Sequence, residues 1–290
     1  MAINYSVIIP YRDTYDLLLR ACESIPDRED IQVLVVDNSA EPLPRERVPV
    51  KAHARLEYLC SDPTKGAGCA RNVGLDHAEG DRVLFMDADD AFTAGAFDIF
   101  DSYLSTEYDI VFFSPTSVVL SSGAEGTRHR FYASLVEECL STGSDERLRY
   151  RFSPPWSKLY RRQLIESGHF RFEVIPVSND LMFSLQCGHA AHMVQASDKV
   201  VYMISEGEKN SSLTTIRSRT NMFVRYQVAV AQYRFVVDHG HPQMRFHLLS
   251  KVVDAFRYFG LREGFRYVGY ARKNHVNIFY GLFKRKTNIG

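Results

Sequence analysis

The sequence has little cysteine and no long apolar run. Its five cysteines are odd in number and widely spaced, and no two form a CxxC pair. This pattern indicates neither a disulfide framework nor a zinc site, so we expect a reducing compartment. No apolar stretch reaches the roughly 18 residues that a membrane-spanning helix needs. Residues 1–10 contain no basic segment and no small-residue cleavage site, so we expect no secretory signal.

Net charge is also absent, but the zero is an average over two unlike parts of the 290 residues. Residues 1–216 contain 21 Lys and Arg against 32 Asp and Glu, whereas residues 217–290 contain 14 against 3. Hydrophobic residues make up 45% and charged residues 24%, which is typical of a globular protein and excludes a disordered chain, a collagen or a coiled coil. The basic segment points to an anionic partner.

The first 115 residues alternate strand and helix patterns. They predict strands at 3–9, 31–36, 56–60, 82–86 and 109–113, and helices at 15–24, 68–77 and 94–104. Such alternation is typical of an α/β domain with a mostly parallel sheet. Ligands of these sheets bind beyond the carboxyl ends of the strands, so the residues that follow each strand are candidates for a site.

The rest of the chain divides by composition. Residues 116–216 are less regular, with a Pro-Pro-Trp turn at 154–156 and a helical pattern at 180–191. Residues 217–290 predict helices at 218–238 and 243–259, followed by a basic, aromatic tail. We therefore expect three segments, with boundaries at 1–115, 116–216 and 217–290.

Three carboxylates lie within four positions after the strand predicted at 82–86. They are Asp87, Asp89 and Asp90, and their mutual repulsion favours a bound cation. Asp87 and Asp89 are two positions apart, so they would project to the same side of an extended backbone. Carboxylate oxygens suit hard divalent ions such as Mg²⁺ or Mn²⁺. The alternative is a solvated acidic turn that caps the next helix.

Several motifs, in order along the chain, resemble those of the family-2 inverting glycosyltransferases. Four lie in the first part, at 7–12 (VIIPYR), 35–39 (VVDNS), 68–75 (GCARNVGL) and 84–90 (LFMDADD). Three later ones resemble acceptor-side elements of bacterial members, at 155–160 (PWSKLY), 179–184 (NDLMFS) and 210–213 (NSSL). The resemblance covers about residues 3–215 and does not reach the basic segment.

The resemblance implies a GT-A fold, a Rossmann-like and mostly parallel sheet, here with a helical C-terminal extension. It implies a nucleotide-sugar donor, with a UDP-sugar favoured, bound by residues 1–115, and an acceptor bound by residues 116–216. Asp89 would hold Mn²⁺ or Mg²⁺ on the donor diphosphate. The residues that would bind the donor itself are Pro10, Tyr11, Arg12, Asp37, Lys65, Arg71, Asp87 and Ala88.

The resemblance also makes Asp180 the catalytic base that takes the proton of the acceptor hydroxyl. One base opposite the leaving group gives a single displacement with inversion. Trp156, Lys158 and Asn179 would bind the acceptor; the alternatives are core packing for Trp156 and a solvated strand position for Lys158. The family's usual acidic residue before the base is Asn179 here, so descriptions with two carboxylates at that position do not transfer.

Processive synthases of the family carry a QxxRW motif and membrane spans. Trp156 is the single tryptophan here and belongs to no such motif. We therefore expect a non-processive hexosyl- or N-acetylhexosaminyltransferase of capsule or lipopolysaccharide type, acting on a glycan or lipid-linked acceptor. One alternative is a sugar-nucleotide nucleotidyltransferase, although no glycine-rich loop follows the first strand. Another is a catalytically inactive sugar- or membrane-binding scaffold, although such a protein would not need the acidic residues.

The basic segment, residues 217–290, also contains 14 Phe and Tyr. Interleaved aromatic and cationic residues are typical of helices at an anionic membrane surface. We therefore expect a cytoplasmic protein that is peripheral at the inner face of the membrane. The alternatives are a homo-oligomer interface, packing against the acidic part of the chain, and a nucleic-acid surface; we expect no nucleic-acid partner.

Overall fold

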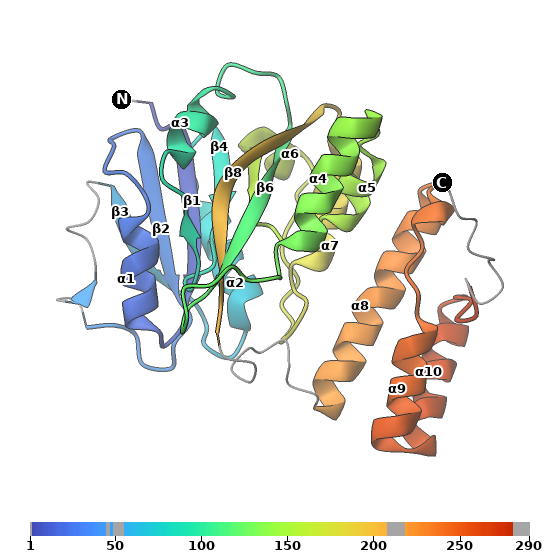
Figure 1. Ribbon diagram of the computed structural model, residues 1–290. Coiled ribbons are helices and arrows are strands. Elements are labelled where there is room, and N and C mark those ends of the chain that lie inside the picture. The colour runs from blue at the N-terminus through green and yellow to red at the C-terminus, as the bar shows by residue number, and fades with distance from the viewer. Residues whose placement is uncertain (1, 45–46, 49–54, 208–217, 281–290) are drawn as a thin grey trace. The chain divides into compact units, whose positions relative to one another are not determined.

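The computed structural model describes residues 2–44, 47–48, 55–207 and 218–280 (Figure 1). The chain divides into two compact units, Met1–Ser212 and Leu213–Gly290. The boundary expected between 216 and 217 lies outside the described residues, as do the motif at 210–213 and the basic residues at 284–286. The expected division of function between residues 1–115 and 116–216 stays a prediction.

The first unit is built on an eight-stranded sheet with the order β3-β2-β1-β4-β7-β6-β8-β5. Pairing is parallel for β1 with β2 and β4, for β2 with β3 and for β6 with β8, and antiparallel for the other three neighbours. The predicted α/β class with a mostly parallel sheet is therefore confirmed. The strands are β1 (Tyr5–Tyr11), β2 (Ile31–Asp37), β3 (Leu56–Cys60), β4 (Arg82–Phe85), β5 (Ala91–Phe92), β6 (Ile110–Val119), β7 (Lys158–Arg161) and β8 (Val194–Glu206).

The helices predicted in the first unit are present, and three further ones, α4, α5 and α6, were not predicted. The helix predicted at 94–104 is shorter, because residues 102–104 bond to carbonyls three positions back and continue as turns. The helices are α1 (Tyr15–Glu23), α2 (Gly66–His77), α3 (Ala96–Asp101), α4 (Arg130–Thr142), α5 (Glu146–Arg151), α6 (Arg162–Ser167) and α7 (Leu181–Ala190).

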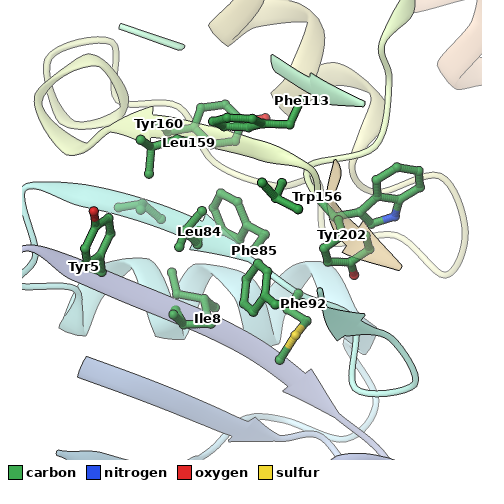
Figure 2. Packing of buried hydrophobic residues seen from close by; sticks show 14 of the residues in the cluster. Tyr5, Ile8, Leu84, Phe85, Phe92, Phe113, Trp156, Leu159, Tyr160 and Tyr202 are labelled. Atoms are coloured by element: carbon green, nitrogen blue, oxygen red, sulfur yellow. The ribbon is translucent and has the colours of Figure 1, made fainter. Parts of the chain in front are cut away.

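The core of the first unit lies around its central strands. All seven residues of β2 are buried, as expected for a continuous apolar run in a sheet that is covered on both faces. Phe85 of β4 packs edge-on against Tyr160 of β7, with ring centroids 5.7 Å apart (Figure 2). Gly74 lets α2 approach β1, since a Cβ there would come 2.4 Å from a methyl carbon of Ile8. These contacts fix the strand ends that carry the site.

The long strand β8 has no counterpart among the predicted elements. Polar residues at 197–199 interrupt its apolar pattern, and the structure accommodates them as an irregularity. Phe113 of β6 lies opposite Ser197, but the next residue, Ser114, lies opposite Val200. The bulge lets a strand with a poor local pattern run along β6 for most of its length (Figure 1).

The second unit is helical and has its own core. It contains α8 (Arg219–Asp238), the short 3-10 helix η3 (Pro242–Met244), α9 (Leu249–Phe259) and α10 (Leu261–Lys273). Tyr226 stacks on Tyr267 with ring centroids 4.5 Å apart. The helix predicted at 218–238 is present, but α10 lies where only a tail was expected. Gly260 (φ 81°) makes the tight turn that separates α9 from α10.

Among the described residues, no helix combines the length and the apolar character that crossing a membrane requires.

Candidate active site

An acidic turn follows β4 and forms the centre of the site. Carboxylate oxygens of Asp87, Asp89 and Asp90 lie within 4.8 Å of one another. The backbone N–H of Asp90 donates to the carbonyl of Asp87 at 3.0 Å. The segment is therefore a turn and not the extended backbone that the sequence argument assumed, because β4 already ends at Phe85. The turn nevertheless brings the carboxylates together.

Asp90 is buried and fixes this turn to β8. Its carboxylate accepts hydrogen bonds from the Tyr202 hydroxyl at 2.8 Å and from the Ser205 backbone N–H at 2.7 Å. The Tyr202 oxygen in turn accepts from the backbone N–H of Asp87 at 3.0 Å. Burial, with the charges of the two neighbouring aspartates, raises the pKa of Asp90. Asp90 thus has a structural role, which leaves Asp87 and Asp89 as the candidate ligand-binding carboxylates of the turn.

Asp89 is exposed, and its carboxylate accepts no hydrogen bond from another residue in the described part of the chain. Its backbone carbonyl accepts from Arg20 of α1, which also donates to the Ser205 hydroxyl at 2.6 Å. Partial desolvation and the charge of Asp87 raise the pKa of Asp89. A cation would relieve this repulsion, so hard oxygen donors at Asp89 and Asp87 fit Mg²⁺ or Mn²⁺.

Arg71 of α2 joins the acidic turn to the segment that carries Asp180. Its guanidinium donates to Asp87 at 2.5 Å and to the side-chain oxygen of Asn179 at 2.9 Å. It also lies over the ring of Phe172, 5.3 Å from the centroid. Arg71 and Asn179 are both buried, so the bridge is internal to the protein. A direct contact of either residue with substrate stays a prediction.

Gly68 and Asn72 of the 68–75 motif hold α2 against residues 172–179, the segment that leads to Asp180. A Cβ at Gly68 would come 2.2 Å from the carbonyl oxygen of Glu173 and 3.0 Å from the Cβ of Asn179. Asn72 exchanges two hydrogen bonds with the backbone of Phe172, at 2.9 and 2.8 Å. The glycine is therefore required for close approach, and the asparagine fixes the register.

Asp180 immediately precedes α7 and is half-buried. Its carboxylate accepts no hydrogen bond from another residue that the structure describes. Burial raises its pKa, while the charge of Arg71 acts in the opposite direction. Ser178, two residues earlier, has a left-handed backbone (φ 62°), a conformation that is costly for a residue with a Cβ. Such strain is often found beside functional residues, and here it precedes the candidate base.

Trp156 packs inside the first unit. Its indole stacks on Tyr202, with centroids 5.3 Å apart and planes 6° from parallel (Figure 2). It meets Tyr132 of α4 edge-on at 5.2 Å, and only 6% of the residue is exposed. These contacts agree with the core-packing alternative for Trp156. The indole also supports Tyr202, which holds the acidic turn. An acceptor contact of Trp156 stays a prediction.

Lys158 of β7 is buried, so the solvated-strand alternative is wrong. β7 lies between β4 and β6 inside the sheet, where both faces are covered. The Lys158 ammonium donates to the carbonyl of Phe152 at 2.6 Å and lies 5.1 Å from the ring centroid of Phe112. Burial lowers the pKa of Lys158 to about 7. Acceptor binding by Lys158 stays a prediction.

The low pKa of Lys158 predicts a specific pH dependence of stability. Between this pKa, about 7, and the ordinary lysine value, the unfolded chain binds one proton more than the folded chain. The free energy of unfolding should therefore rise with pH by about 1.4 kcal/mol per unit in this window. Urea denaturation at several pH values would measure this slope, and Lys158→Met should lack this contribution. Parallel curves for the two proteins would contradict the low pKa.

The other residues predicted to bind the donor lie at or near the same edge of the sheet. Tyr11 ends β1 directly opposite Asp37, which ends β2. Asp37 is buried and accepts hydrogen bonds from the backbone N–H groups of Ser39 and Leu43, at 2.6 and 3.1 Å, and from the Tyr58 hydroxyl. Asp37 therefore organises the loop after β2, and its contact with a nucleoside stays a prediction.

Arg12 and Lys65, the two exposed cations predicted to bind the donor, each lie near an aspartate. Arg12 lies 3.5 Å from Asp13, and Lys65, just before α2, lies 3.3 Å from Asp62. Pro10 is half-buried in β1, and Ala88 is buried within the acidic turn. The structure thus places Arg12, Asp37 and Ala88 at or just after the carboxyl ends of β1, β2 and β4, which the sheet order makes neighbours. Lys65 instead follows β3. Contacts of these residues with a donor stay predictions.

Sequence reasoning missed two residues that support the site. Arg20 and Tyr202 hold the acidic turn, yet they come from α1 and β8. Neither belongs to a local motif, so no signal in the sequence pointed to them.

The chain belongs to glycosyl transferase family 2, whose family model matches residues 6–174. Its relatives include TarS of Staphylococcus aureus, a poly(ribitol-phosphate) beta-N-acetylglucosaminyltransferase, which is 25% identical over 221 residues. That match covers 72% of this chain but 37% of TarS, so the chain spans little more than a third of that relative. The succinoglycan biosynthesis protein ExoW of Rhizobium meliloti is 26% identical over 258 residues, 79% of either chain.

A third relative is the GalNAc(5)-diNAcBac-PP-undecaprenol beta-1,3-glucosyltransferase of Campylobacter jejuni, 25% identical over 173 residues, 58% of this chain and 55% of that one. Among solved structures, S. aureus TarS 1–349 in complex with UDP-GlcNAc superposes with a TM-score of 0.73 at 18% identity, covering 94% of this chain and 80% of that one. A mannosyltransferase from Pyrobaculum calidifontis, in complex with GDP-Man and Mn²⁺, gives 0.58 at 15% identity, covering 94% and 81%. The predicted GT-A fold is thereby confirmed.

Proposed function

We propose that the protein is a metal-dependent inverting glycosyltransferase. It transfers one sugar from a nucleotide diphosphate donor, a UDP-sugar, to a hydroxyl of a glycan or lipid-linked acceptor. The observation that carries this proposal is the Arg71 bridge, which joins Asp87 of the acidic turn to Asn179, next to Asp180. Three comparisons support the proposal: membership of the family, the UDP-GlcNAc bound in the TarS structure, and the undecaprenol-linked substrate named for the C. jejuni relative.

Asp180 removes the proton of the acceptor hydroxyl in this proposal. Burial raises its pKa, which makes its carboxylate a stronger base than that of an ordinary aspartate, while the neighbouring charge of Arg71 opposes this rise. The acceptor oxygen then forms a bond to the anomeric carbon on the face opposite the donor diphosphate. The bond to the diphosphate oxygen breaks, and its electron pair leaves with that oxygen, so the anomeric carbon is inverted.

The acidic turn carries the other half of the site. Asp89 and Asp87 would hold the cation, and Asp90 keeps the turn in place through Tyr202. When bound, Mg²⁺ or Mn²⁺ supplies positive charge to the diphosphate oxygens. The family's use of divalent metals and the Mn²⁺ in the P. calidifontis structure support this assignment.

A product assay with a panel of nucleotide sugars, with and without Mn²⁺, tests the proposal. We expect release of a nucleoside diphosphate and transfer to a glycan or polyprenyl-linked acceptor, both abolished by EDTA. Release of pyrophosphate from a nucleotide triphosphate would instead identify a nucleotidyltransferase. Sugar binding without turnover of any donor would identify a scaffold.

We further propose that the basic segment, residues 217–290, binds the anionic inner face of the membrane, so that the enzyme is cytoplasmic and peripheral. Adjacent helices α9 and α10 expose the apolar side chains of Val253, Leu261 and Phe265 beside the exposed Arg257 and Arg262. Apolar and cationic side chains on one helical pair are suited to insertion among anionic headgroups. A lipid-linked acceptor would give the enzyme a reason to bind there.

Replacing Lys284, Arg285 and Lys286 together with Gln should weaken vesicle binding about a hundredfold. Each cation near an anionic leaflet contributes about 1 kcal/mol, an effect that fades within a Debye length. Sedimentation with anionic and neutral vesicles, at low and high salt, measures the binding. Donor hydrolysis by water should be unchanged, since the proposed catalytic residues belong to the first unit. Equal binding to both lipids, insensitive to salt, would contradict the proposal.

A further inference from the structure

Residues 125–129 form a loop before α4, and Glu206 at the end of β8 holds it. One carboxylate oxygen of Glu206 accepts hydrogen bonds from the backbone N–H groups of Thr127 and Arg128, at 2.6 and 2.7 Å. These bonds lower the pKa of Glu206, which keeps it ionised. Charge-assisted bonds of this kind are stronger than neutral ones, so the backbone of Arg128 is firmly placed.

Two further contacts fix the same loop to β6. The backbone N–H of Gly126 donates to the carbonyl of Ser117 at 2.8 Å, and a ring nitrogen of His129 pairs with the Ser117 hydroxyl at 2.7 Å. A Cβ at Gly126 would come 2.2 Å from Glu206 and 2.6 Å from the Ser117 hydroxyl. A Cβ at position 126 would have to displace the side chains of Glu206 and Ser117. The position of the loop is therefore specified by several independent contacts.

The strand that holds this loop also holds the acidic turn. Ser205 precedes Glu206 in β8; its backbone N–H bonds to Asp90 at 2.7 Å, and its hydroxyl accepts from Arg20 at 2.6 Å. Consecutive residues of one strand therefore bind the acidic turn and the backbone of Arg128. Arg128 thus lies at the rim of the proposed metal site.

The side chain of Arg128 is exposed and forms no ion pair or hydrogen bond within the described part of the chain. Arg20 and Arg71, the other arginines at this site, donate to protein oxygens. Arg128 is close enough to the acidic turn for its positive charge to act on Asp89. An uncommitted guanidinium beside carboxylates that would bind a divalent ion is suited to a second anion, such as a diphosphate.

We propose that Arg128 binds the diphosphate of the donor and of the departing nucleotide, and that Glu206 and Gly126 position it. The inference rests on the proposed glycosyl transfer and adds a binding residue that the motifs do not contain. A guanidinium offers two parallel donors to phosphate oxygens. As the bond from the anomeric carbon to the diphosphate breaks, negative charge grows on the leaving oxygen, and a fixed cation there lowers the barrier.

Binding of UDP, UMP and uridine, measured by calorimetry with and without Mn²⁺, tests the assignment. Arg128→Ala should weaken UDP binding about 10–100-fold, as expected for loss of hydrogen bonds to a charged group, and leave uridine binding unchanged. Gly126→Ala should weaken UDP binding in the same direction, because it displaces the loop. Arg130→Ala, an exposed arginine at the start of α4, is the matched control and should behave as wild type.

The outcomes separate this inference from the proposed function. If the wild-type protein binds UDP and transfers sugar, and Arg128→Ala does both equally well, only the role of Arg128 is wrong. An equal loss of UDP and uridine binding in Arg128→Ala would also overturn it, because the residue would then act on the whole pocket. If the wild-type protein neither binds a nucleoside diphosphate nor turns over any donor, the proposed function itself fails.

Discussion

Asp180→Asn is expected to lower turnover roughly 10²–10⁴-fold, the range typical of losing a general base. The amide is nearly isosteric with the carboxylate but cannot accept the acceptor's proton at neutral pH. Because the carboxylate of Asp180 makes no hydrogen bond within the described structure, its replacement should not disturb folding. Initial rates at saturating donor and acceptor, with the melting temperature as a check of folding, measure the effect.

Donor binding provides the control for this variant. Asp180 is proposed to act on the acceptor, so nucleoside diphosphate affinity should stay near the wild-type value. Asp198→Asn, the same chemical change in the bulge of β8, should leave turnover unchanged. Wild-type turnover in Asp180→Asn, or a loss confined to nucleotide affinity, would show that another group is the base.

Local patterns were sufficient to predict the parallel strands at the start of the chain. β1, β2 and β4 are short apolar runs whose positions follow from sequence alone, and their parallel pairing brings Tyr11, Asp37 and Asp87 to one edge. Asp87 and Asp89 could be singled out because their repulsion is a property of adjacent positions. The strands and the acidic turn could thus be predicted from short stretches of sequence, and the parallel α/β class then brings them to one edge.

Long-range contacts explain what could not be predicted. Tyr202 reaches Asp90 across 112 positions, and Arg20 reaches Ser205 across 185. The periodicity of apolar residues within a helix or strand gives no information about partners so far apart in the sequence. The burial of Lys158 could not be predicted either. It follows from the antiparallel insertion of β7 between β4 and β6, and a strand of four residues gives no local signal of where it lies in the sheet.

Asp89→Asn is expected to lower turnover by about 10²–10³-fold, a loss comparable to deleting one preorganised electrostatic group. Asp89 is the one carboxylate of the acidic turn that is exposed and accepts no hydrogen bond from another described residue, so a bound divalent ion depends on it more than on its neighbours.

The Asn variant keeps the shape of Asp89 but loses the charge, and Mn²⁺ affinity should fall with turnover. Mn²⁺ titration by calorimetry, together with initial rates over a range of Mn²⁺ concentrations, measures both. Added Mn²⁺ should restore part of the lost rate, and EDTA should abolish wild-type activity. Asp98→Asn, an exposed carboxylate in α3, should change neither quantity. Full wild-type turnover in EDTA would show that Asp89 does not act through a metal, because the leaving diphosphate would then be stabilised by protein groups alone.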